Sequence, residues 1–129
     1  MSPISQEHSK HELERFGQAW LTAWNSHDLE SVLSLYEEDF RFSSPVLKKL
    51  LPQSGGHIRG KEAARGYWSR AFAPGINLRF EPIAVLCGVD SVIIHYKGLR
   101  GRLCAEFFQL GSSGKVVESH AHEYELSAA

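Results

Sequence analysis

The dominant spacing of apolar residues changes near residues 73–77, and this change constrains the fold more than any other feature. Before it, apolar side chains recur every three or four residues, as on one face of an amphipathic helix. After it, they occur in short alternating runs that glycine-containing turns separate, which is typical of antiparallel strands. Helices followed by strands predict an α+β domain, with three N-terminal helices packed on one face of an antiparallel sheet.

Capping residues and apolar stripes mark the three helices. Ser9 and Glu12 form a capping box at the start of the first helix. Asp28 is placed to cap the second helix, and the third begins after Gly60 and ends at "APG". The stripes are Leu13, Phe16, Trp20, Ala23 and Trp24, then Leu29, Val32, Leu33 and Tyr36, and finally Ala64, Tyr67, Trp68, Ala71 and Phe72.

The segment between the second and third helices is less regular. "FRFSSPV", residues 40–46, predicts a short strand that ends at Pro45, because proline has no N–H to donate to a neighbouring strand. Residues 46–59 mix apolar residues with lysines, a proline and two glycines. This composition predicts a mobile flap rather than regular secondary structure.

The second half of the chain predicts four strands near residues 77–87, 90–98, 102–110 and 115–124. Their short connections favour an antiparallel meander. The pattern contains no internal repeat and no linker, so we expect a single domain over residues 1–129.

The turn in "KGLRGR" decides which side chains lie beside Glu106. A three-residue loop, Leu99-Arg100-Gly101 with Gly101 left-handed, fits better than a two-residue turn, because Leu-Arg is a poor sequence for positive φ. This loop places Ile94 opposite Glu106. The two-residue alternative would rotate His95 toward Cys104 and make it an acid/base partner of Glu106.

The last turn completes the assignment of faces. If "GSSG" is a four-residue loop, Leu110 lies opposite Lys115 and Glu106 lies opposite Ser119. The more apolar face, which we assign to the helices, carries Val92, Ile94, Tyr96, Cys104, Glu106, Phe108, Val117, Ser119 and Ala121. The outer face carries His95, Leu103, Ala105, Phe107, Gln109, Val116, Glu118, His120 and His122. The outer face is too apolar for full exposure and no helix remains to cover it, which predicts a homodimer through this face.

Charge and composition narrow the partners. A net charge of −1 over 129 residues offers no electrostatic attraction for nucleic acid or an anionic membrane. The N-terminus "MSPISQEHSK" lacks the apolar core of a signal peptide, so a cytoplasmic location is expected. Cys87 and Cys104 fall in predicted strands and are interpreted as buried thiols in a reducing compartment.

A strand that runs into "SSP", a helix that opens at "RGKEAARGYW" and a final hairpin "FFQLGSSGKVVESHAH" resemble the nuclear transport factor 2-like superfamily. The most similar types are the SnoaL-like polyketide cyclases and the ketosteroid-isomerase-like proteins, and the similarity extends from about Leu13 to Tyr124. It implies a curved, cone-shaped sheet around a pocket roofed by helices, often with a dimer through the outer face. It also implies a small, mostly apolar ligand and acid/base chemistry without a cofactor.

The resemblance also implies roles for particular positions. Trp20 takes the place of the helix-one tyrosine of ketosteroid isomerases, and Ser44 takes the place of their catalytic base. Glu106 matches the proton-donating acid, and Tyr67 matches a pocket aromatic. A serine hydroxyl is not basic near neutral pH, so ketosteroid isomerisation itself is not expected.

Glu106 is therefore the predicted proton carrier, with a pKa raised by desolvation beside apolar neighbours. The predicted ligand contacts are Trp20, Ser44, Tyr67, Tyr96 and Ser119. The reaction could be an isomerisation, cyclisation, hydration or dehydration. The alternative is a non-catalytic ligand-binding or dimerisation module of the same fold, with Glu106 simply buried by the fold.

Three histidines share the outer face, His95, His120 and His122. His95 and His120 are separated by a whole strand, a gap of roughly 10 Å that is too wide for one metal ion. No metal site is expected, and these histidines are predicted to form hydrogen bonds at the dimer interface.

Overall fold

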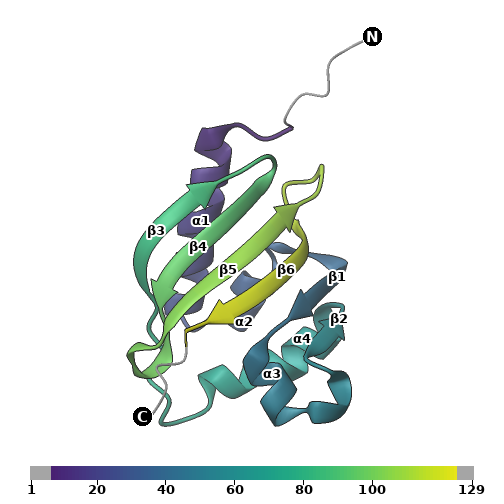
Figure 1. The fold of residues 1–129 in the computed structure, drawn as a ribbon, viewed down its shortest axis with the longest axis vertical. Helices are drawn as coiled ribbons and strands as arrows, with labels where there is room; N and C mark the ends of the chain where they lie inside the picture. The colour runs from purple at the N-terminus through teal and green to yellow at the C-terminus, as the bar shows by residue number, and fades with distance from the viewer. Residues whose placement is uncertain (1–6, 125–129) are drawn as a thin grey trace.

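The computed structural model describes residues 7–124, which form helices packed against one six-stranded sheet (Figure 1). The α-helices are α1 (Lys10–Asn25), α2 (Leu29–Leu33), α3 (Pro45–Leu50) and α4 (Lys61–Trp68). Short 3₁₀ helices are η1 (Pro52–Ser54), η2 (Ser69–Phe72) and η3 (Leu99–Gly101). The strands are β1 (Tyr36–Ser43), β2 (His57–Arg59), β3 (Glu81–Cys87), β4 (Ser91–Lys97), β5 (Leu103–Leu110) and β6 (Val116–Glu123). The predicted α+β class is confirmed: the sheet is curved and not closed.

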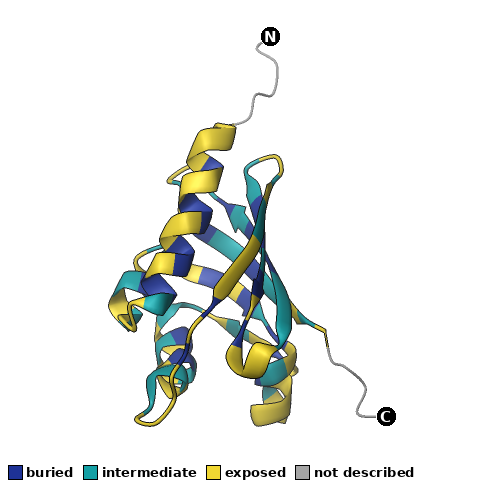
Figure 2. Cartoon of the chain, turned by 90° about the vertical axis from the view of Figure 1, so that its left-hand side faces the viewer, coloured by how far each residue is buried: buried dark blue, intermediate teal, exposed yellow. Residues whose placement is uncertain are grey.

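The first helix begins as its capping residues predict. The Ser9 hydroxyl accepts a hydrogen bond from the Glu12 N–H at 3.1 Å, and the Glu12 carboxylate accepts one from the Ser9 N–H at 3.2 Å. The buried residues of α1 face the sheet and its exposed residues face away (Figure 2). Within residues 7–124, no helix is both long enough and apolar enough to cross a bilayer.

The second helix is shorter than its stripe predicts. It ends at Leu33, and Tyr36 is the first residue of β1. The cause is a long-range pairing: Tyr36 lies opposite Val116 of β6, whose N–H donates to the Leu35 carbonyl at 2.9 Å. This pairing satisfies backbone groups that a longer helix would have satisfied internally.

The position of β1 makes the sheet mixed. The strand order is β2-β1-β6-β5-β4-β3, in which β3 to β6 form the expected antiparallel meander. β1 pairs with β6 in parallel, with Phe42 opposite Ser119. The chain between β1 and β3 crosses from one edge of the sheet to the opposite edge. The first strand of the chain, β1, therefore lies beside the last, β6, and we call this parallel pairing the β1–β6 seam.

The predicted register between β4 and β5 is confirmed. Ile94 lies opposite Glu106, and Gly101 has a left-handed φ of 72° in a loop formed by Leu99–Gly101. His95 pairs with Ala105 and therefore lies on the outer face, which excludes the alternative that made it a partner of Glu106.

The predicted register between β5 and β6 is wrong by two residues. Glu106 lies opposite Ala121, Phe108 lies opposite Ser119, and the register shifts between Gln109 and Leu110. An even displacement keeps Ser119 and Ala121 on their predicted face. The irregularity, however, buries Val116 fully in the core, so its predicted place on the outer face is wrong.

Residues 46–59 are ordered, contrary to the expected flap. Ser44 is the N-cap of α3, and its hydroxyl accepts hydrogen bonds from the N–H groups of Val46 and Leu47. β2 then pairs with β1, with Ile58 opposite Phe42. Pro45 occupies the first turn of the helix, where its missing N–H leaves no bond unmade.

Candidate functional site

A cavity of about 740 Å³ lies between the inner face of the sheet and the helical layer. Its walls come from α1, the β1–α3 junction, α4 with η2, and strands β4 to β6. The deep part is lined mainly by aromatic and aliphatic side chains, which include Trp20, Trp24, Phe42, Trp68 and Phe80. A volume of this size suits a small organic molecule rather than a polymer.

Glu106 is placed on the cavity wall by the alternation of β5. The residue is 5% exposed and lines the cavity, with Ile94 and Ala121 beside it on the neighbouring strands. Burial raises the pKa of its carboxyl from the ordinary 4.5 to about 8. The Tyr96 hydroxyl donates a hydrogen bond to Glu106 Oε1 at 3.3 Å, which partly opposes that rise. Glu106 is thus a carboxyl that carries a proton near neutral pH and borders an apolar hollow.

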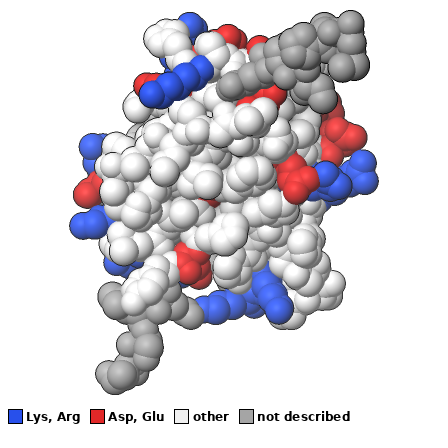
Figure 3. Space-filling view, turned by 45° about the horizontal axis from the view of Figure 1, so that its top comes forward, with Lys and Arg blue, Asp and Glu red and all other residues white. Residues whose placement is uncertain are grey.

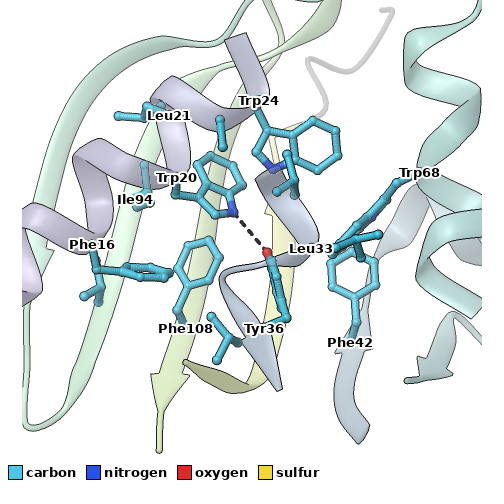
Figure 4. Close-up of a cluster of buried hydrophobic side chains, with 14 of the residues drawn as sticks. Phe16, Trp20, Leu21, Trp24, Leu33, Tyr36, Phe42, Trp68, Ile94 and Phe108 are labelled. Atoms are coloured by element: carbon cyan, nitrogen blue, oxygen red, sulfur yellow. Dashed lines mark hydrogen bonds between the residues drawn. The ribbon is translucent and has the colours of Figure 1, made fainter. Parts of the chain in front are cut away.

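Tyr36 is a polar neighbour that we did not predict. The Trp20 indole N–H donates to the Tyr36 hydroxyl at 3.0 Å (Figure 4). Burial raises the Tyr36 pKa well above its ordinary value, and the charge of Glu106 raises it further. Phe40 and Phe42 alternate with exposed residues along β1, but Glu38 is exposed and the register with β6 shifts between Tyr36 and Arg41. No period-two pattern therefore extends to Tyr36.

Trp20 and Ser119 have surroundings that differ from the predicted ones. Trp20 lines the cavity but gives its N–H to Tyr36 rather than to a ligand or to Glu106. Ser119 is fully buried behind the wall and is not among the residues that line the cavity. Its hydroxyl lies close enough to Tyr36 to lower that pKa slightly, although the geometry falls short of a hydrogen bond. A ligand in the cavity would therefore not contact the Ser119 side chain.

Ser44, Tyr67 and Tyr96 all line the cavity. Burial raises the pKa of the Tyr67 phenol, and the nearby Ser44 hydroxyl acts in the opposite direction. Burial also raises the Tyr96 pKa well above its ordinary value, with the charge of Glu106 as the next cause. Both phenols stay protonated at neutral pH. The Tyr67 hydroxyl can donate a hydrogen bond to a ligand, whereas the Tyr96 hydroxyl donates its hydrogen to Glu106 and can accept a hydrogen bond from a ligand.

The mouth of the cavity is polar. Arg70 of η2, Arg100 of η3, Arg102 and Glu123 all line it. An ion pair at 3.1 Å joins Arg102 to Glu123. The cavity thus has positively charged side chains at its mouth and an apolar interior.

The outer face of the sheet carries a second polar cluster, defined by Ser43, His120, Glu118 and Arg41. The Ser43 hydroxyl contacts His120 Nδ1, His120 Nε2 lies 2.7 Å from Glu118 Oε2, and Glu118 also pairs with Arg41. Among residues 7–124, no three His, Cys, Asp or Glu side chains lie close enough together to hold a metal ion.

The comparisons with known proteins agree with this architecture. The SnoaL-like domain profile matches residues 18–121. A SnoaL-like protein of unknown function from Burkholderia thailandensis E264 is 41% identical, and the alignment covers 91% of this chain and 98% of that chain with a TM-score of 0.86. No protein with a curated function matches this chain.

Two more distant structures share the fold. A candidate ketosteroid isomerase from Kribbella flavida DSM 17836 is 16% identical, covers 92% of this chain and 82% of that chain, and has a TM-score of 0.73. The epoxide hydrolase/cyclase-like enzyme SalBIII, which has a role in pyran ring formation in the polyether salinomycin, is also 16% identical. That alignment covers 90% of this chain and 93% of SalBIII, with a TM-score of 0.73. Structures described as nuclear transport factor 2-like share this fold. The match over residues 18–121 and the 41% identity show that this chain belongs to the SnoaL-like family.

Proposed function

We propose that this protein binds a small, mostly apolar molecule in the cavity and transfers a proton to or from it without a cofactor, with Glu106 as the proton carrier. The observation that supports the proposal best is a buried carboxyl on the wall of an apolar cavity, with a pKa raised to about 8. Related folds include a candidate isomerase and a cyclase-like enzyme, and both of these reaction types need a positioned acid or base.

The chemistry follows from the protonation state of Glu106. With a pKa of about 8, about nine in ten molecules would carry the proton at pH 7. The neutral carboxyl can donate this proton to a ligand oxygen or an electron-rich carbon. The carboxylate left behind keeps the hydrogen bond from Tyr96, and in the reverse direction it accepts a proton from the ligand.

A single proton carrier narrows the reaction type. Among the described residues that line the cavity, the other carboxyl is Glu123, which is paired with Arg102 at the mouth. Ser44 cannot act as a base, because its hydroxyl is not basic and already caps α3. Glu106 would therefore take and return the same proton, as in an isomerisation. Alternatively, it would protonate an oxygen whose bond to carbon breaks, and the resulting carboxylate would accept the proton released when another hydroxyl forms a ring or when a C–H bond is lost.

The alternative proposal is a ligand-binding module without catalysis. The serine at position 44 favours it, because the position matched to a catalytic base serves here as a helix cap. In that case Glu106 would contribute a hydrogen bond to the ligand and no proton transfer.

A comparison of wild type with Glu106→Gln separates the two proposals. Compounds that raise the melting temperature of the wild type are incubated with each protein, and products are detected by mass spectrometry and NMR. Conversion by wild type and loss of conversion by Glu106→Gln would support catalysis, and Glu118→Gln on the outer face is the matched control. Conversion that survives in Glu106→Gln would refute the role of Glu106.

The outer face of the sheet supports a further proposal, a homodimer. Leu86, Ile93 and Phe107 lie in register across β3, β4 and β5, and Leu86 and Ile93 are 53% and 41% exposed. This face is largely uncharged, and charged side chains gather mostly around its edge (Figure 3). Such a continuous apolar surface is typical of a subunit interface. We also propose a cytoplasmic location, which suits the free thiols of Cys87 and Cys104.

A further inference from the structure

We propose that the ligand carries an anionic head group of carboxylate or sulfonate type, which Arg70 and Arg100 bind at the cavity mouth while the apolar body enters the cavity. This inference rests on the proposed function, because it takes the cavity as the binding site. The ligand class is thereby narrowed from small apolar molecules to amphipathic anions.

Two separate segments bring the arginines to one opening. Arg70 belongs to η2, which follows α4, and Arg100 belongs to η3, between β4 and β5. Both segments lie at the same end of the molecule (Figure 1), and both side chains line the same cavity. Arg70 and Arg100 are exposed, so their guanidinium groups are accessible to a ligand that enters.

The positive charge at this opening is not neutralised by the described chain. Arg102 is paired with Glu123, but within residues 7–124 no carboxylate lies within ion-pairing distance of Arg70 or Arg100. Glu106 adds little negative charge at pH 7, because burial keeps most of it protonated. A local excess of positive charge on a protein of net charge −1 favours an anion at this place.

The backbone of Arg100 supports the same inference. Three residues other than glycine have positive φ in the described chain: His27, Asp90 and Arg100. The His27 ring bonds the Leu78 carbonyl, and the Asp90 carboxylate accepts the N–H of His8. Arg100, with a φ of 60°, has no such side-chain bond in residues 7–124, although the conformation costs about 1 kcal/mol or more. This conformation belongs to the β4–β5 turn, in which the Arg102 N–H donates to the Leu99 carbonyl at 3.3 Å, so the turn fixes the place where Arg100 is presented at the opening.

The shape of the site suits such a ligand. An apolar body inside the cavity would contact the aromatic walls and reach Glu106, and the head group would remain at the opening. Because the opening is exposed to water, the head group would keep part of its hydration and avoid the penalty of a buried charge. A guanidinium also matches the planar geometry of a carboxylate and donates two parallel hydrogen bonds to it.

The test uses two fluorescent probes that share one apolar ring system, anilinonaphthalene sulfonate and its uncharged parent phenylnaphthylamine. Dissociation constants are measured by fluorescence titration for wild type, for Glu106→Gln and for the double variant Arg70→Gln/Arg100→Gln. Arg15→Gln is the matched control, because Arg15 is also exposed but does not line the cavity. Melting temperatures confirm that each variant is folded, and the two single variants replace the double variant if it is not.

We expect wild type to bind the sulfonate about tenfold more tightly than the neutral probe, which corresponds to about 1.4 kcal/mol. The double variant should lose this preference, and Arg15→Gln and Glu106→Gln should keep it. Equal binding of both probes by wild type, or a preference that survives in the double variant, would overturn the inference and leave the proposed proton transfer standing. Failure of both probes to bind would overturn the inference together with the cavity as a binding site.

Discussion

Glu106→Gln should stabilise the protein at alkaline pH, and the size of the effect follows from the burial of the carboxyl. Folding raises the Glu106 pKa from 4.5 to about 8. Between these values the unfolded chain has lost the proton and the folded chain retains it, so stability decreases as the pH rises. The decrease is fully developed above pH 8 and absent below 4.5.

The magnitude is the pKa difference multiplied by about 1.4 kcal/mol per pH unit. A difference of about 3.5 between 4.5 and about 8 gives about 5 kcal/mol. Water that enters the cavity would stabilise the carboxylate and reduce this value. Glutamine is nearly isosteric, is uncharged at every pH and can still accept the hydrogen bond from Tyr96.

The assay is urea unfolding followed by tryptophan fluorescence from pH 5 to pH 9. We expect wild type to lose stability relative to Glu106→Gln over this range, by about 1 kcal/mol or more per pH unit near pH 7. Glu118→Gln on the outer face should behave differently, because the hydrogen bond from His120 lowers the pKa of Glu118 and stabilises its charged form. Parallel pH dependences for wild type and Glu106→Gln would refute the reasoning, since they would show that the Glu106 carboxyl is not desolvated.

Three further predictions concern other parts of the fold. The hydrogen bond to the Gly111 carbonyl raises the pKa of His8, so its contribution is complete below the ordinary value of 6.5 and is lost as the pH rises through the raised value. Urea unfolding should therefore show the stability difference between wild type and His8→Gln decreasing above pH 6.5, and a constant difference would contradict the assignment. Ser44→Ala should lower the free energy of unfolding by about 1 kcal/mol, because α3 loses its N-cap. Ser44→Asp should restore the stability, because aspartate also caps helices. An unchanged urea midpoint in Ser44→Ala would show that the cap is dispensable. Ile93→Glu should convert the proposed dimer to a monomer in light scattering, with Leu50→Glu on α3 as the control; a wild type that is monomeric at high concentration would exclude the dimer.

Local signals in the sequence determined much of this structure. The capping residues Ser9 and Asp28 act within three residues of their own position, so they place the helix starts without knowledge of the rest of the chain. The loop of Leu99–Gly101 determined the β4–β5 register in the same way, because its conformation depends on its own residues. From that register followed the placement of Glu106 on the inner face.

Only the tertiary structure decided the features that depend on contacts between distant segments. Tyr36 carries a helical spacing with Val32 and Leu33, but pairing with Val116, eighty residues further on, draws it into β1. The same parallel seam buries Ser119 behind the cavity wall and gives the Trp20 N–H to Tyr36. Arg70 and Arg100 at the mouth also come from separate segments that meet only in the folded chain. Backbone hydrogen bonds and burial between segments far apart in the sequence leave no local pattern in the residues. The sequence alone could therefore indicate the fold and the role of Glu106, but not all of the side chains around Glu106.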